Sequence, residues 1–167
     1  MTSNVQTTES RKMARSRPID FEMVYNVEFE SVIRGHHIYK DTWNPVIGEN
    51  LECKSDKRKK AMLHDANSLG IYNLEGDLVG HVPVELSNLL TNFLKADITN
   101  NLSATVVDKR KKEKGLVVPA KFIARTQNKM AAKTLKLFLT AKKNSFPSLN
   151  LTKEEVVKTP LIQYPVH

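Results

Sequence analysis

The chain has 167 residues, of which 40% are hydrophobic, and its formal net charge is +8 at pH 7. This length is typical of one globular domain with additional arms. No run of about 18 apolar residues is present, which excludes a transmembrane helix. The first residues are basic but precede no apolar stretch, and the single cysteine, Cys53, cannot form an internal disulfide. We therefore expect an intracellular protein in a reducing compartment, without a secretory signal or a membrane partner.

The positive charge is concentrated at the two ends of the sequence. Residues 1–20 carry a net charge of +2, residues 126–167 carry +5, and residues 21–125 carry only +1. Residues 1–20 are polar and lack periodicity, which is typical of a disordered arm. We therefore predict three parts: a disordered basic arm over residues 1–20, a folded domain over residues 21–125 and a basic tail over residues 126–167.

Two lysine-rich runs interrupt the nearly neutral middle of the chain, Lys54–Lys60 and Lys109–Lys114. Each falls between strand-like segments, where a solvated hairpin loop and a phosphate-contacting loop both fit the pattern. Lysine clusters attract polyanions with strong salt dependence and little sequence specificity. Either run also matches a nuclear import signal, so a nuclear location is a further expectation. The candidate phosphate contacts are Lys57, Arg58, Lys59, Lys60, Lys109, Arg110, Lys111 and Lys112.

Alternation of apolar and polar residues predicts strands on both sides of these runs. Residues 25–33 alternate with period two, and residues 47–53 resume the alternation. Between them, residues 36–45 have the pattern of a loop or a short irregular strand. Residues 102–106 and 116–122 alternate in the same way and predict two strands joined by the second lysine-rich run.

A hairpin and a helix are predicted in the centre of the chain. Leu69–Tyr72 and Leu78–Val82 flank Glu75-Gly76-Asp77, a three-residue hairpin signal. Pro83 suits the start of a helix, and residues 86–94 place leucine and phenylalanine on one helical face. The predicted fold is mainly β (α+β), a small OB-like barrel of five or six strands capped by one or two helices.

The segment over residues 129–142 has two interpretations. Its apolar residues form a helical stripe with lysines on the other faces, yet Leu135, Leu137 and Leu139 also alternate as in a strand. We favour a short basic amphipathic helix. Beyond Asn144 the sequence has three prolines and no durable period, so we expect a tail there.

The sequence predicts neither a metal site nor an active site. His36 and His37 would point to opposite faces of a strand, and no C-x2-C or H-x3-H pair accompanies the other histidines. Cys53 is in phase with its apolar neighbours, so we expect a buried core thiol. Glycine-rich phosphate loops, nucleophile elbows and paired carboxylates are missing from the sequence. We expect no catalysis, no cofactor and no bound metal.

Polar residues near the ends of short β-elements are the candidate ligand contacts. Asp65 fits a turn as well as a groove. His81 lies at the end of a strand just before a helix. Its side chain could hydrogen-bond to nearby backbone groups or line a ligand pocket. Tyr39 and Trp43 are the candidate stacking aromatics, although Trp43 also fits the core. A base stacked on an aromatic ring is worth roughly 1–3 kcal/mol.

Four segments, with the spacing between them, resemble the HIRAN domain family. They are Val32–Gly35, Pro45–Glu49, His64–Asn67 and Leu78–Leu86. The resemblance implies a modified OB-like barrel with helices between its strands. It also implies binding of the 3′ end of single-stranded DNA, in which bases stack on aromatic rings and an aspartate binds the terminal hydroxyl.

The resemblance assigns roles to individual residues. Asp65 occupies the position of the hydroxyl-binding aspartate, and His81 that of a pocket histidine. His64 stands where the family has a tyrosine, and His37 stands where it has an arginine. The implied nucleic-acid pocket consists of Asp65, His81, His64, His37, Tyr39 and Trp43.

The expected function is that of a non-enzymatic nucleic-acid-binding module. It would bind single-stranded DNA or a DNA end weakly, and it would do so as a monomer. The alternative is a protein-interaction or regulatory module that has lost the DNA pocket, because several pocket positions of the family carry other residues in this chain.

Overall fold

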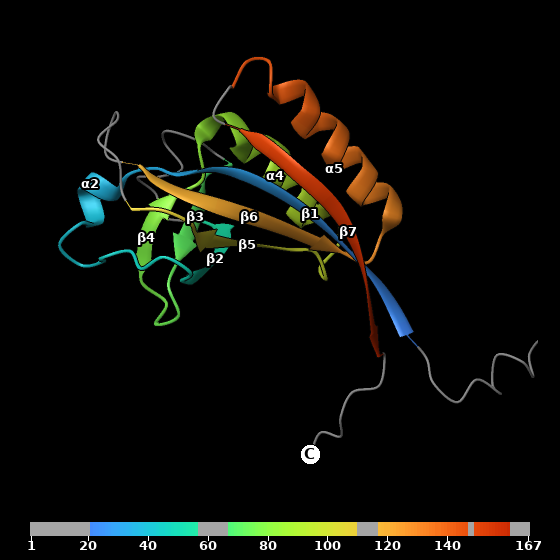
Figure 1. Cartoon of the computed structure of the whole chain (residues 1–167), viewed down its shortest axis with the longest axis horizontal. Helices are drawn as coiled ribbons and strands as arrows, with labels where there is room; N and C mark the ends of the chain where they lie inside the picture. Colours follow the sequence, from blue (N-terminus) through green and yellow to red (C-terminus); the bar gives the residue numbers. More distant parts are fainter. Residues whose placement is uncertain (1–20, 57–66, 110–116, 147–148, 161–167) are drawn as a thin grey trace, which may run out of the picture.

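The computed structural model describes residues 21–56, 67–109, 117–146 and 149–160, which form a mainly β fold (Figure 1). In these residues seven strands make one antiparallel sheet in the order β4-β3-β2-β5-β6-β1-β7. The strands are β1 (Phe21–Ile33), β2 (Asn50–Ser55), β3 (Leu69–Tyr72), β4 (Leu78–His81), β5 (Asn101–Val106), β6 (Val118–Thr126) and β7 (Asn150–Pro160). The helices are α2 (His36–Tyr39), α4 (Val84–Ala96) and α5 (Lys129–Lys142). No helix in these ranges is long and apolar enough to cross a membrane.

The sheet is not closed into a barrel, which corrects the fold predicted from the sequence. Closure would require β4 to pair along β1. Instead β7 occupies that edge of β1, from the pair Phe21–Pro160 to the pair Glu30–Asn150. Strand β4 therefore meets only the end of β1, through an isolated bridge between Arg34 and His81.

The core lies between one face of the sheet and the two longer helices. Phe29 of β1 and Phe122 of β6 are directly opposite one another, and their rings stack with centroids 5.3 Å apart. Both side chains are fully buried, together with Leu86 and Leu90 of α4 and Leu139 of α5. Both helices therefore cover the same face, because their buried residues belong to the same cluster as the phenylalanine pair.

The predicted β3–β4 hairpin is confirmed. The side-chain oxygen of Asn73 accepts hydrogen bonds from the backbone N–H groups of Glu75 (3.1 Å) and Asp77 (2.8 Å). Gly76 has a φ of 88°, a conformation that favours glycine. Helix α4 then begins directly after Pro83, and its predicted apolar face is the buried one.

Two local predictions between β1 and β2 are wrong. His36–Tyr39 forms the short helix α2 rather than a loop or a strand. Gly35, with a φ of 87°, allows the chain to turn from β1 into this helix. Ile47 is 58% exposed and precedes β2, whereas Leu51 and Cys53 are buried as predicted.

The expected tail after Asn144 is also corrected, because residues 150–160 form the edge strand β7. An edge strand is built from backbone hydrogen bonds, which do not require the apolar period that the sequence lacks there. Phe146 and Leu149 are buried and hold the connection between α5 and β7 in the core. Helix α5 itself occupies the residues of the expected basic helix.

A close approach of β4 to the end of β1 depends on Gly80. A Cβ added to this residue would lie 2.5 Å from Cγ2 of Ile33 and 2.9 Å from the carbonyl oxygen of Arg34. Real Cβ atoms do not approach other heavy atoms this closely. The backbones of β1 and β4 can therefore meet here only because position 80 has no side chain.

We expect Gly80→Ala to destabilise the protein by about 1–3 kcal/mol, the range typical of overpacking. Urea unfolding would measure this free energy. Ser55→Ala, an exposed position at the end of β2, is the control and should change the free energy of unfolding by less than about 0.5 kcal/mol. Equal stability of the two variants would show that the approach is not constrained by Gly80.

Candidate nucleic-acid interface

A buried carboxylate orients the side chain of His81. Nε2 of His81 lies 2.7 Å from Oδ2 of Asp56, the residue that follows β2. The Asp56 side chain is fully buried, whereas that of His81 is 24% exposed. The backbone N–H of Asp56 donates to the carbonyl of Ser68 (3.0 Å), which holds the carboxylate beside β3. The imidazole of His81 is thus held in place and still reaches the surface.

Helix α2 places an aromatic ring beside His81. The rings of Tyr39 and His81 are tilted by 47°, with centroids 6.3 Å apart. Tyr39 is partly exposed. A Cβ at Gly35 would lie 3.9 Å from Nδ1 of His81 and 4.0 Å from the Tyr39 ring. The turn at Gly35 therefore brings two partly exposed rings together at the end of β1.

Arg34 places an ion-paired guanidinium at the same site. Its backbone exchanges two hydrogen bonds with His81, each 2.9 Å long. Its guanidinium lies 2.7 Å from the carboxylate of Glu85 at the start of α4, and it also lies over the ring of Phe146, 5.5 Å from the centroid. Arg34 and Glu85 are each about 40% exposed, at 38% and 42% of their side-chain surfaces. Arg34 thus joins β1 and α4 at the rim of the His81 site.

The described residues that border the stretch 57–66, which holds most of the first lysine-rich run, lie near this site. The run leaves the described residues at Asp56, the partner of His81. The chain re-enters at Asn67, whose side-chain amide donates to Asn88 of α4 (3.1 Å) and whose carbonyl accepts from Thr91 (2.9 Å). The second run returns at the start of β6, where Val118 pairs with the last residue of β1. The described residues Asp56 and Val118, which flank the undescribed parts of the two runs, therefore lie near the end of β1.

The structure brings together two of the predicted pocket residues, His81 and Tyr39. It places Trp43 in the core, where the ring is 5% exposed. The indole N–H of Trp43 donates to the carboxylate of Glu49 (3.0 Å), and the ring meets His36 edge-on. Trp43 therefore presents no open face for stacking, and the core interpretation fits it better.

The other predicted contacts are mostly outside the described part of the chain. Lys109 is described and exposed. Only the backbone of His37 is described, within α2. Outside the described residues lie His64, Asp65, Lys57, Arg58, Lys59, Lys60, Arg110, Lys111 and Lys112. Their roles stay predictions.

Sequence reasoning missed three residues of the site: Arg34, Asp56 and Glu85. Asp56 had a signal, since it is the acidic residue within the lysine-rich run KSDKRKK. An acidic residue within a basic run can indicate a carboxylate that is buried against a partner. The partner of Asp56, His81, is distant in the sequence and could not be identified from it. The Arg34–Glu85 ion pair depends on the approach of β1 to α4, which no local pattern indicates.

The described residues offer little reactive chemistry. Within residues 21–56, 67–109, 117–146 and 149–160, no three His, Cys, Asp or Glu side chains are grouped so that they could hold a metal ion. Cys53 is 4% exposed, and burial raises the pKa of its thiol. Because the thiolate is the reactive form of cysteine, Cys53 is a poor nucleophile. Its role is packing, as the sequence predicted.

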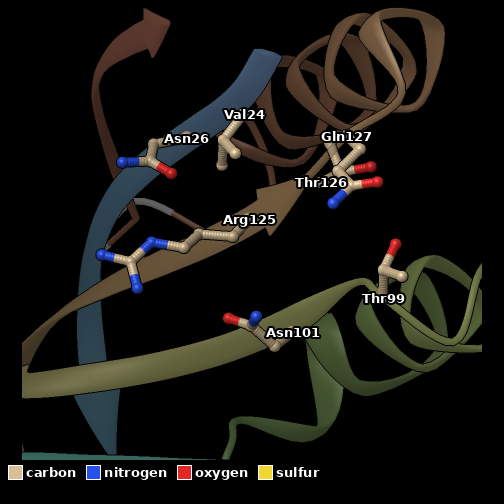
Figure 2. A pocket seen from close by; sticks show the side chains of 7 residues that line it. All are labelled: Val24, Asn26, Thr99, Asn101, Arg125, Thr126 and Gln127. Atoms are coloured by element: carbon tan, nitrogen blue, oxygen red, sulfur yellow. The ribbon is translucent and has the colours of Figure 1, made fainter. Parts of the chain in front are cut away.

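A polar pocket of about 360 Å³ lies elsewhere on the sheet (Figure 2). Its row of Asn26, Arg125 and Asn101 is formed by residues directly opposite one another on β1, β6 and β5. Asn26 is 6% exposed, and its side-chain oxygen has no hydrogen-bond partner. Along β1 this row is eight residues from Arg34, roughly 26 Å at the rise of a strand. The pocket is therefore separate from the His81 site.

Comparison with solved structures identifies the architecture. No family model matches the sequence, and no curated protein matches it. The crystal structure of the HIRAN domain of human HLTF matches with a TM-score of 0.55 and 17% identity, covering 77% of this chain and 97% of that chain. The NMR structure of the HLTF HIRAN domain in its DNA-bound conformation matches with a TM-score of 0.51 and 18% identity, covering 72% and 89%. The chain therefore has the fold of the HIRAN domain, in agreement with the resemblance in its sequence.

Proposed function

We propose that this chain is a non-enzymatic nucleic-acid-binding module that holds single-stranded DNA, or a DNA end, at the His81 site. The observation that carries the proposal is the partly exposed His81, fixed by Asp56 at the end of β4 in a HIRAN-like fold. The HIRAN domain of HLTF, which has this fold, has been solved in its DNA-bound conformation. The fold and the position of the site together support the transfer of that activity to this chain.

The chemistry of the site suits a nucleic acid. The adjacent rings of Tyr39 and His81 offer partly exposed aromatic surface, and bases stack on such rings without sequence preference. At the rim, the guanidinium of Arg34 is paired with Glu85 and is partly exposed. Asp56 and Val118, which flank the undescribed parts of the two lysine-rich runs, lie near the end of β1. Lysines and arginines that contact phosphates supply affinity that falls with salt. We expect Asp65 to receive the terminal hydroxyl and His64 and His37 to line the same pocket.

The proposed complex is weak and strongly salt-dependent, because most of its positive charges are lysines on the two runs. We infer one DNA site per chain and a monomeric protein. We also infer a nuclear location, in which either lysine-rich run serves as the import signal. No catalytic role is proposed for this module.

Titration of the full chain with a fluorescein-labelled single strand that ends in a 3′ hydroxyl tests the proposal. We expect binding at about 50 mM salt that weakens by tenfold or more at about 200 mM. Asp65→Ala should weaken binding of the 3′-hydroxyl strand but not binding of a matched strand that ends in a 3′ phosphate. Replacement of lysines 57, 59 and 60 by glutamine should weaken both strands equally.

Absence of binding at about 50 mM salt would refute the proposal, since phosphate contacts are strongest there. Binding that Asp65→Ala and His81→Ala leave unchanged would contradict the assignment of the pocket. Such a result would favour the alternative, a protein-interaction module whose DNA pocket has been lost.

A second prediction follows from the contact between Asp56 and His81. We expect Asp56→Asn to weaken binding of the same strand about 3- to 10-fold, the effect of one hydrogen bond worth about 1 kcal/mol. Asp77→Asn, in the exposed β3–β4 turn, removes the same charge without touching His81. It should leave binding unchanged or slightly tighter. Equal affinities of the two variants would mean that the carboxylate does not orient His81 for DNA.

A further inference from the structure

A groove runs between helices α4 and α5, on the outer side of the helical layer. Two hollows of about 280 and 530 Å³ share three lining residues, Leu89, Asn92 and Phe138, so they form one continuous depression. We call it the α4–α5 groove. At one end of the groove Ala96 of α4 lies with Met130 of α5, and at the other end Asn88 of α4 lies with Lys142 of α5. The two helices therefore run in opposite directions along its walls.

The walls of this groove expose apolar surface that the core does not use. Helix α5 contributes Leu135 and Leu139 to the core, and both are buried. Leu135 also lies in the floor of the groove, and Met130 and Phe138 line it with 66% and 53% of their surfaces exposed. Leu137 adjoins them and is 69% exposed. Three large exposed apolar side chains within three turns of one helix are typical of an interaction surface.

The dimensions of the groove fit a helix. From Met130 to Lys142 the wall spans thirteen residues of α5, or about 18 Å at the rise of a helix. A partner helix of about three turns would cover this length. Helices that bind in such grooves use apolar residues at positions i, i+3 or i+4, and i+7.

The charged residues around the groove indicate the net charge that a partner helix should carry. Helix α5 has four lysines and no acidic residue. Lys142 is part of the groove wall, and Lys133 lies one turn from both Met130 and Leu137. One acidic residue lies near the end of the groove. Asp97, after α4, accepts hydrogen bonds from the N–H and hydroxyl of Thr99, which lower the pKa of its carboxyl and keep it negatively charged.

We propose that the α4–α5 groove binds an acidic amphipathic helix from a protein partner. Phe138 and Met130 receive its apolar stripe, while Lys142 in the wall and Lys133 beside Met130 face its carboxylates. This site does not depend on the DNA function proposed above. The groove is lined by α4 and α5, whereas the DNA site lies at His81, Tyr39 and Arg34.

The sharpest test lets the full chain choose the charge of its ligand. A display library would consist of 16-residue peptides with leucine fixed at a helical i, i+3, i+4, i+7 stripe. The other positions would be randomised among Glu, Gln and Lys. We expect the selected peptides to be net negative and to bind Phe138→Glu at least tenfold more weakly, as measured by fluorescence anisotropy. Circular dichroism would verify that the variant remains folded.

Matched variants separate groove binding from surface hydrophobicity and from charge. Leu74→Glu, at an 88% exposed leucine in the β3–β4 turn, should bind the selected peptides as the unmodified chain does. The double variant Lys133→Glu and Lys142→Glu should lose the preference for acidic peptides. Phe138→Glu should leave affinity for the DNA strand unchanged, so failure of one site can be told from failure of the other.

Three outcomes would overturn the proposal. Selected peptides that are neutral or basic would contradict the charge argument. A dimer in sedimentation experiments that Phe138→Glu dissociates would mean that a second copy of this chain covers the groove. Binding to vesicles of anionic phospholipid that the same substitution abolishes, without any selected peptide, would assign the surface to a membrane.

Discussion

The sheet and its candidate site are organised by the contact between β4 and the end of β1. Gly80 has no side chain, so the two backbones approach closely enough for Arg34 and His81 to exchange two hydrogen bonds. The sheet is thereby curled toward closure, yet β7 holds the edge of β1 and keeps it open. One bridge therefore defines both the shape of the sheet and the position of its candidate site.

The candidate site follows from that bridge. His81 is the residue after Gly80, so the approach that Gly80 permits fixes the backbone of His81. The buried carboxylate of Asp56 then fixes its ring. Gly35, next to Arg34, begins the turn that carries Tyr39 to the same place. A surface with two aromatic rings and an ion-paired arginine is thus built from the ends of three strands and one short helix.

Local patterns predicted the elements, while contacts between distant segments could not be predicted. The β3–β4 hairpin and the apolar face of α4 follow from turn chemistry and helical period, and both are present. Strand β7 is missing from the prediction because its pairing with β1 rests on backbone hydrogen bonds. The prediction of a barrel is wrong for the same reason, because β7 pairs with the edge of β1 that a closed barrel would need. At the site, His81 could be singled out by its place before a helix. Its partner Asp56 and the burial of Trp43 arise from tertiary packing alone.

We expect nucleic acid to bind at the end of β1 and to leave the helical layer free. This can be measured by NMR titration of the isotope-labelled full chain with a single strand that ends in a 3′ hydroxyl, at about 50 mM salt. The resonances of Arg34, Tyr39 and His81 should shift together and saturate, while those of Phe138 in α5 should not move. Shifts confined to α5, or to the polar pocket around Arg125, would contradict this expectation.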